Sequence, residues 1–218
     1  MSIIKSEIDG HTIVFVGSFN PQIFQPAWFA SQNLLKNEEA DGAKIEIISR
    51  ELVAFSSGWL RIEVMSERVI FATAQAQAFE WLRDLAIGTF RVLPHTPISM
   101  LGINRDMHFR FETEEEWHSI GHRLAPKEIW KGVLIDPGMA GLTMRGRRPD
   151  EHKGALNVRV EPSDRIKPGV FVNVNDHYEL QSLEPSHGAD QILNLLETSW
   201  PISVARSRNI SESIVGLK

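Results

Sequence analysis

Two short runs of polar residues lie inside stretches that are otherwise typical of β-strands. The first is Asn104, Arg105, Asp106 and His108, and the second is Asn175, Asp176, His177 and Tyr178. Residues two apart in a strand share a face, so Asn104, Asp106 and His108 should point the same way. Asn, Asp and His that converge are the groups of a general-base or metal site. Such residues also serve to satisfy sheet edges and nearby loops.

The two runs form one site only if their strands are neighbours in one sheet. In that case Asp106 or His108 should approach Asn175 or His177. Tyr178 is the only tyrosine of the chain and adds an amphipathic contact. A ligand-facing concavity is one physical reason for polar residues in the middle of a strand.

A third candidate is the pair His118 and His122 in the segment EEEWHSIGH. Four-residue spacing places both imidazoles on one face of a helix, as a zinc pair requires. The hydrolytic zinc motif has Glu directly after its first His, and Ser119 stands there instead. Two readings remain, a metal-dependent or general-base enzyme that adds Asp106 and His108, and a solvated helix face.

A local basic cluster lies on a chain that is acidic as a whole. Its densest part is Arg145, Arg147 and Arg148, which are candidates for contacting phosphate or nucleic acid. No aromatic residues interleave with the cluster, which disfavours stacking on single strands. A solvated hairpin loop is the simpler reading. The sequence contains no GxxxxGK[ST], strand–GxGxxG–helix or GxSxG motif.

An aromatic group near the N-terminus is the best candidate for a partner surface. Phe24, Trp28 and Phe29 lie close together at the start of a predicted helix. Tryptophan is enriched at the centres of protein interfaces. Plain core packing is the alternative.

The predicted elements of the first half follow from apolar periodicity and turn residues. Short apolar runs bounded by turn residues predict strands at 12–18, 44–49, 51–55, 59–65 and 68–72, and the run at 59–65 also alternates with a period of two. A period of 3.6 predicts helices at 27–36 and 75–92.

The second half repeats this order. Strands are predicted at 97–111, 131–135, 141–146, 155–161 and 169–180. Helices are predicted from Thr113, which has capping-box spacing to Glu116, to 123, and at 188–200. A last helix covers 201–215 after Pro201.

Each half thus reads strand, helix, four strands, helix. The chain is predicted to be a single domain, 1–218, with a pseudo-repeat at 10–93 and 97–200 and a C-terminal helix at 201–215. The expected class is α+β, a curved, largely antiparallel sheet from two β-α-β4-α units with helices on one face. This layout resembles the tandem saddle of the TATA-box-binding-protein fold, a likeness of architecture that implies no shared function.

The run Gly102-Ile103-Asn104-Arg105 resembles the strand motif of a sporadically distributed family of uncharacterised bacterial proteins, and the closing helices are similar in character. Ile103 stands where that motif would have tyrosine. The resemblance implies a bacterial origin and no particular chemistry.

The amino-acid composition and net charge of the chain exclude several classes of function. The 218 residues are 42% hydrophobic with net charge −5, a globular composition without general attraction to nucleic acid or anionic membrane. The absence of cysteine removes disulfides, thiolate metal sites and Cys nucleophiles. No apolar run approaches the roughly 20 residues that span a bilayer, and no signal peptide is recognisable. A cytoplasmic protein is expected.

The function favoured by the sequence is a non-enzymatic binding or assembly protein that self-associates or belongs to a protein complex. No cofactor, metal, catalytic residue or membrane contact is expected. One alternative is an enzyme using Asp106 and His108 with His118 and His122. The other is a phosphate or nucleic-acid binder using Arg145, Arg147 and Arg148, with nucleic acid the less expected partner.

Overall fold

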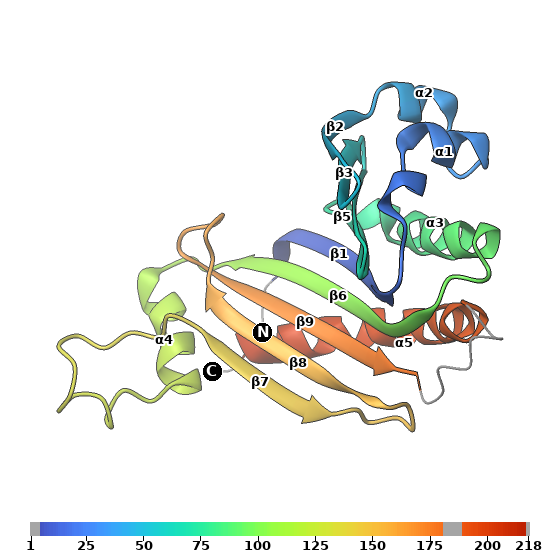
Figure 1. Ribbon diagram of the computed structural model, residues 1–218. Coiled ribbons are helices and arrows are strands. Elements are labelled where there is room, and N and C mark those ends of the chain that lie inside the picture. The colour runs from blue at the N-terminus through green and yellow to red at the C-terminus, as the bar shows by residue number, and fades with distance from the viewer. Residues whose placement is uncertain (1–4, 181–188, 217–218) are drawn as a thin grey trace.

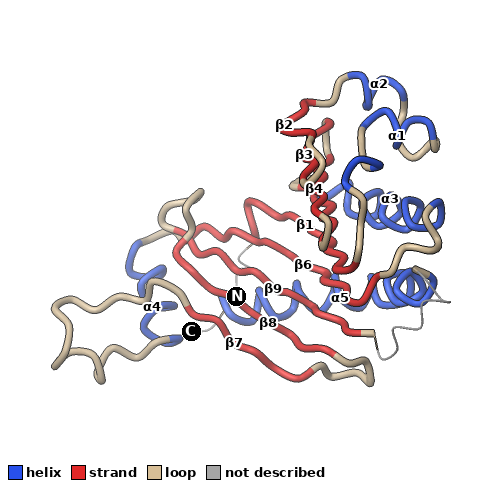
Figure 2. Tube along the Cα trace, viewed as in Figure 1, coloured by secondary structure: helices blue, strands red, loops and turns tan. Residues whose placement is uncertain are grey.

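The computed structural model describes residues 5–180 and 189–216 (Figures 1 and 2). These residues form a nine-stranded sheet in which every pairing is antiparallel. Figure 1 shows β2, β3 and β5 turned steeply relative to the strands of the second half. The predicted α+β class and the curved sheet are confirmed.

The first half contributes five strands and most of the short helices. Its elements are β1 (Ser6–Gly17), α1 (Pro26–Ser31), α2 (Asn37–Asp41), β2 (Lys44–Ile48), β3 (Leu52–Ser57), β4 (Leu60–Met65), β5 (Arg68–Thr73) and α3 (Phe79–Val92). The predicted helix 27–36 ends early because Asn33 adopts a left-handed backbone conformation, with φ of 58°. Two single 3₁₀ turns, Pro21–Ile23 and Ala76–Ala78, precede α1 and α3.

The second half follows the same order with one strand fewer. Its elements are β6 (Ile98–Arg110), α4 (Glu114–Leu124), β7 (Leu142–Arg147), β8 (Gly154–Pro162), β9 (Gly169–Glu179) and α5 (Asp190–Val215). Thr113 caps α4, since its hydroxyl accepts from the Glu116 amide at 3.2 Å. The predicted start of the next helix, Gly188, lies outside the described residues.

The predicted strand 131–135 is wrong, so the second unit has three strands after its first helix. The segment forms helical turns instead, because the Lys131 amide donates to the Lys127 carbonyl and the Leu134 amide to the Trp130 carbonyl. Such local bonds occupy backbone groups that a strand would use.

The predicted separate helix 201–215 is also wrong, because α5 continues through Pro201. Buried side chains lie on both sides of the proline, with Trp200 before it and Ser203 after it. Packing of this continuous face outweighs the one hydrogen bond that Pro201 cannot donate. Four serines recur every four residues on the buried face of α5, namely Ser199, Ser203, Ser207 and Ser211.

The strand order is β2-β3-β4-β5-β1-β6-β9-β8-β7. The pair β1–β6 is central, and Ile13 lies opposite Ile103 in it. Moving outwards, β5, β4 and β3 on one side correspond to β9, β8 and β7 on the other. Only β2 has no counterpart among the described strands.

The two faces of the sheet differ in what covers them. On the covered face, Ile13 and Ile103 pack with Trp200 of α5 and Phe90 of α3 in the main apolar cluster. A second cluster joins Phe109 and other strand residues to Ile120 of α4 and Val215 of α5. All these helices therefore contact one face, and we call the opposite one the open face. In Figure 1, α5 runs behind the sheet.

No helix among residues 5–180 and 189–216 combines the length and apolar character needed to cross a bilayer.

Candidate functional site on the open face

A row of amide side chains crosses three strands of the open face. Asn104 of β6 lies opposite Asn175 of β9, which lies opposite Asn157 of β8. The Asn157 amide nitrogen donates to the Asn175 side-chain oxygen at 2.9 Å, and the Asn175 nitrogen donates to the Asn104 oxygen at 2.6 Å. The Asn104 nitrogen donates to the Thr12 carbonyl at 3.3 Å. We call Asn104, Asn175 and Asn157 the amide row.

The amide row retains hydrogen-bonding capacity beyond these contacts. A primary amide has two N–H donors and an oxygen with two lone pairs. The row uses one donor and one acceptor of Asn175, and all three side chains are only half-buried. The remaining groups are held in fixed positions by the row itself.

Gly102 makes room for the row. A Cβ at this position would lie 3.2 Å from the Asn175 amide nitrogen and 3.4 Å from that of Asn104. The four-residue run at 102–105 thus has a local explanation. Gly102 leaves space, Ile103 enters the core, Asn104 joins the row and the Arg105 side chain is buried on the covered face.

The expected approach of Asp106 or His108 to Asn175 or His177 is wrong by two residues of register. Asp106 lies opposite Asn173, whose amide nitrogen donates to its carboxylate at 2.8 Å. His108 lies opposite Phe171, and His177 lies opposite Gly102. The two polar runs do occupy adjacent strands, but the amide pair Asn104–Asn175 joins them.

His108 is buried against the β8–β9 connection. Its Nδ1 lies 2.8 Å from the Ser163 hydroxyl, which accepts from the backbone amides of Arg165 and Ile166. The hydroxyl therefore has its hydrogen free to donate to Nδ1. Burial, followed by the charge of Arg165, lowers the pKa of His108. A neutral imidazole that anchors a turn is the result.

Beside Asp106 and His108 the open face deepens into a cleft of about 760 Å³. Arg61 and Trp59 line it from the first half, and Arg159, Arg165 and Phe171 line it from the second. The Arg159 guanidinium lies 5.2 Å from the centre of the Phe171 ring. The cleft is consequently both charged and aromatic.

The alternate residues of the two runs lie on the covered face. The Asp176 carboxylate bonds to Arg148 and to Arg206 of α5, the latter at 2.9 Å. The Tyr178 hydroxyl donates to Asp176 at 3.3 Å. Arg105 likewise pairs with the Asp9 carboxylate of β1 on the covered face. Asp176, Tyr178 and Arg105 therefore hold α5 to the sheet and are not exposed on the open face.

Arg148 cannot serve as the predicted phosphate contact. It is buried and bonds to Asp150 through two nitrogens, at 2.8 and 2.7 Å, as well as to Asp176. Both carboxylates already neutralise its charge. Arg145 and Arg147, in contrast, are exposed on β7.

The predicted histidine pair lies on the other side of the sheet from Asp106. His118 and His122 are exposed on α4, which packs on the covered face through Ile120. The sheet therefore separates them from His108. Among the described residues, no group of three or more His, Asp or Glu is placed to hold a metal ion.

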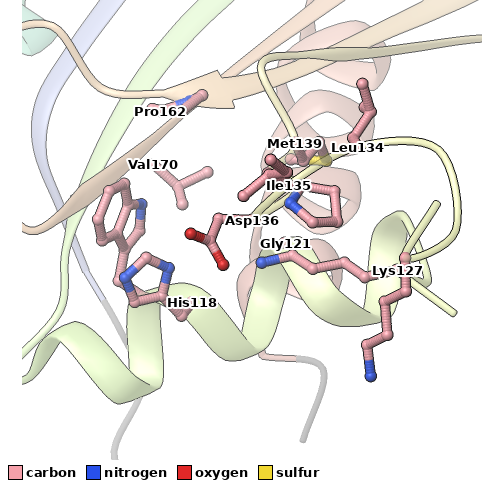
Figure 3. Close-up of a pocket in the computed structure, with 13 residues that line it drawn as sticks. His118, Gly121, Lys127, Leu134, Ile135, Asp136, Met139, Pro162 and Val170 are labelled. Atoms are coloured by element: carbon pink, nitrogen blue, oxygen red, sulfur yellow. The ribbon is translucent and has the colours of Figure 1, made fainter.

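An open pocket of about 830 Å³ lies beside α4 (Figure 3). Figure 3 shows His118 and Asp136 on facing sides of it, with apolar side chains around them. Lys131, Leu134 and Ile135 form part of its wall. The segment 129–135 exposes apolar side chains, with Ile135 96% exposed and Ile129 75% exposed. In Figure 1 the loop between α4 and β7 projects from the body of the protein.

The predicted aromatic partner surface is largely core. Phe24 and Phe29 are buried, with ring centres 6.3 Å from Phe90 and 6.0 Å from Phe55 respectively. Trp28 is half-buried and packs against the same cluster. The rings of Phe24 and Phe29 therefore point into the main apolar cluster.

Asn157 and Asn173 belong to the site and were not among the residues predicted for it. Each lies at an alternate, polar position of a strand adjacent to Asn175 or Asp106. The alternation of polar side chains along these strands was the sequence signal that could have identified both residues.

No protein-family model matches the chain, and a search of curated proteins returns no match.

Proposed function

We propose that this protein is a non-enzymatic binding or assembly protein whose open face holds a protein partner. The amide row is the observation that supports this most directly. Three mutually bonded amides present donors and acceptors whose positions are fixed before any partner arrives. Pre-ordering of this kind reduces the entropy lost on binding.

Binding suits these residues better than catalysis. A general base needs a free lone pair within reach of a substrate proton. The His108 Nδ1 is occupied by Ser163, and the Asp106 carboxylate accepts from Asn173. The acceptor nitrogen of His108 is thus occupied, and one oxygen of Asp106 is bonded to the neighbouring strand.

The test is quantitative affinity purification of the tagged full-length chain from its native cells. Asn175→Ala removes the centre of the amide row and should reduce recovery of the partner at least about tenfold, the effect of about 1.4 kcal/mol. Asn209→Ala is the matched control, because Asn209 is an exposed amide on α5. Unchanged circular dichroism confirms folding. Equal recovery of every co-purifying protein by both variants would contradict the proposal.

The exposed apolar segment 129–135 favours assembly through a second surface. Contiguous exposed apolar side chains mark interaction sites in folded proteins, and Val133, Leu134 and Ile135 are each more than half exposed. Light scattering after size exclusion tests self-association. The mass of a dimer or larger species should fall to that of the monomer in Val133→Ser/Ile135→Ser, whereas a wild-type protein that is monomeric at all concentrations contradicts self-association.

A further inference from the structure

We propose that the free edge of β7 is a strand-addition site for an extended peptide in which acidic and apolar residues alternate. This edge lies one strand beyond the amide row, and its outward-facing backbone groups are distinct from the row and from segment 129–135.

The edge of β7 is open along its length. β7 pairs with β8 on one side and ends the strand order on the other. Every residue from Thr143 to Arg147 is exposed. An edge strand presents unpaired backbone N–H and C=O groups, and an extended peptide can bond to them as a further strand.

The two faces of β7 carry different chemistry. Arg145 lies opposite Asn157, which places Arg145 and Arg147 on the open face. Met144 lies on the covered face and is 60% exposed. Side chains of an added strand alternate between the same two faces. One set of its residues would lie beside the arginines and the other beside Met144.

The charge of this edge is uncompensated within the described residues. Neither Arg145 nor Arg147 has a carboxylate oxygen within 4.0 Å among them, although Arg148 next in sequence has two such partners. Arg159 on β8 adds a third guanidinium to the open face. Its Nη1 lies 3.4 Å from a carboxylate oxygen of Glu161. Acidic side chains on the added strand would complement these charges.

The first half of the molecule already contains such an arrangement. In the symmetric strand order β7 takes the place of β3, and β3 does have an outer neighbour, β2. Glu46 of β2 lies between Ile45 and Ile47, where the register with β3 shifts, and it bonds to Arg61 of β4 at 3.2 and 3.0 Å. An acidic residue flanked by apolar ones therefore already pairs with an arginine near the opposite edge of the same sheet.

The probe for the experiment is a fluorescein-labelled peptide, acetyl-TEVEVET-amide, titrated with the full-length protein by fluorescence anisotropy. Saturable binding should weaken as salt rises from about 50 to about 500 mM, because the Debye length shortens. The block peptide acetyl-TEEEVVT-amide has the same composition without alternation and should bind at least about tenfold more weakly, since one face would receive mixed residues.

Two variants assign the site. Arg145→Glu/Arg147→Glu should abolish binding of the acidic peptide and create binding of acetyl-TKVKVKT-amide. Arg68→Glu, an exposed arginine on β5, is the matched control and should leave the affinity within about twofold, because it lies five strands away from β7. Asn175→Ala should also bind the peptide normally, so loss of the amide-row partner and loss of peptide binding are separable.

Hydrogen exchange monitored by mass spectrometry locates the added strand. Exchange should slow in residues 142–147 on binding and stay unchanged in 44–48. The proposal is overturned by equal binding of the alternating and block peptides, by unchanged exchange in 142–147, or by an affinity for single-stranded oligonucleotide that equals the peptide's. The absence of saturable binding would also overturn it and leave the arginines as protection against edge-to-edge aggregation.

Discussion

Arg105 and Asp9 are joined by two parallel hydrogen bonds on the covered face of the sheet. The Arg105 Nε lies 2.9 Å from one carboxylate oxygen of Asp9, and Nη2 lies 2.6 Å from the other. The remaining Nη1 donates to the Val204 carbonyl of α5 at 3.0 Å. Arg105 separates Ile103 of the main apolar cluster from Met107 of the second. A charged contact thus divides the core at the centre of β6.

Removing one partner of this pair should destabilise the protein strongly. Asp9→Ala leaves a guanidinium that is only 1% exposed without its carboxylate, which should cost roughly 3 kcal/mol of unfolding free energy. Arg105→Met/Asp9→Leu removes both charges and should cost less than the single change. Urea denaturation measures both values. A double variant less stable than Asp9→Ala would contradict this.

The two carboxylates that bind Arg148 and Arg206 should differ in their effect on stability. Asp176 is 1% exposed and Asp150 is 29% exposed. Asp176→Ala should cost about 3 kcal/mol or more, because two arginines lose a buried counter-charge. Asp150→Ala should cost at least about 1 kcal/mol less than Asp176→Ala, since water can replace the partly exposed carboxylate of Asp150. Thermal unfolding of the two variants at one pH checks the order, and equal costs would refute it.

Acid should destabilise the protein through His11. Burial, followed by the charge of Arg105, lowers the pKa of His11 to about 3, against about 6.5 in the unfolded chain. Between these values the unfolded state binds the additional proton, so unfolding free energy falls as pH falls, by up to about 1.4 kcal/mol per unit. The contribution is fully present above pH 6.5. Urea denaturation between pH 7 and pH 4 measures it.

His11→Leu is the control for this pH dependence. Neither ring nitrogen of His11 has a hydrogen-bond partner among the described residues, and the ring packs on Phe79 with centres 4.2 Å apart. Leucine should therefore be tolerated and should flatten the curve. The pKa of His108 is also lowered, and His108 is present in both the wild-type protein and His11→Leu. The difference between the two curves therefore isolates His11. Parallel curves would sink the assignment.

The serines of α5 should respond oppositely to shortening and enlargement. The Ser203 hydroxyl is buried and has no hydrogen-bond partner among the described residues. Ser203→Ala removes an unsatisfied polar atom and should stabilise the protein by about 1 kcal/mol. Ser203→Leu forces the helix away from the sheet and should cost about 1–3 kcal/mol. Chemical denaturation of both variants is the measurement, and a destabilising Ser203→Ala would show that the hydroxyl has a partner.

Much of the fold follows from local pattern. The alternation of Leu60, Ile62 and Val64 with charged residues predicts β4, and the helical spacing of Leu82, Leu85 and Phe90 predicts α3. These patterns suffice because one face of each element is buried. The prediction of a helix boundary at Pro201 fails because long-range packing keeps α5 continuous through the proline. The predicted strand at 131–135 fails because this segment forms local helical turns and pairs with no described strand.

The candidate site was predictable only in part. Because side chains alternate between the two faces of a strand, Asn104 and Asp106 were correctly expected to share a face of β6. The same rule applied to β9 would have placed Asp176 on the opposite face from Asn175. The pairing of Asn104 with Asn175 depends on register, which is fixed by contacts between residues about 70 positions apart. The burial of Arg148 could not be read from an arginine-rich hairpin, because its partner Asp176 lies on another strand.

Strand β6 serves two purposes through alternate residues, and this limits how its gene can change. Loss or gain of a single codon within 98–103 would move Asn104 under α5 and turn the Arg105 side chain out to solvent, reversing every later position of the strand. Substitutions at individual positions carry no such penalty. Descendants of this sequence should therefore tolerate length changes in the segment between α4 and β7 far more readily than in the strand at the centre of the sheet.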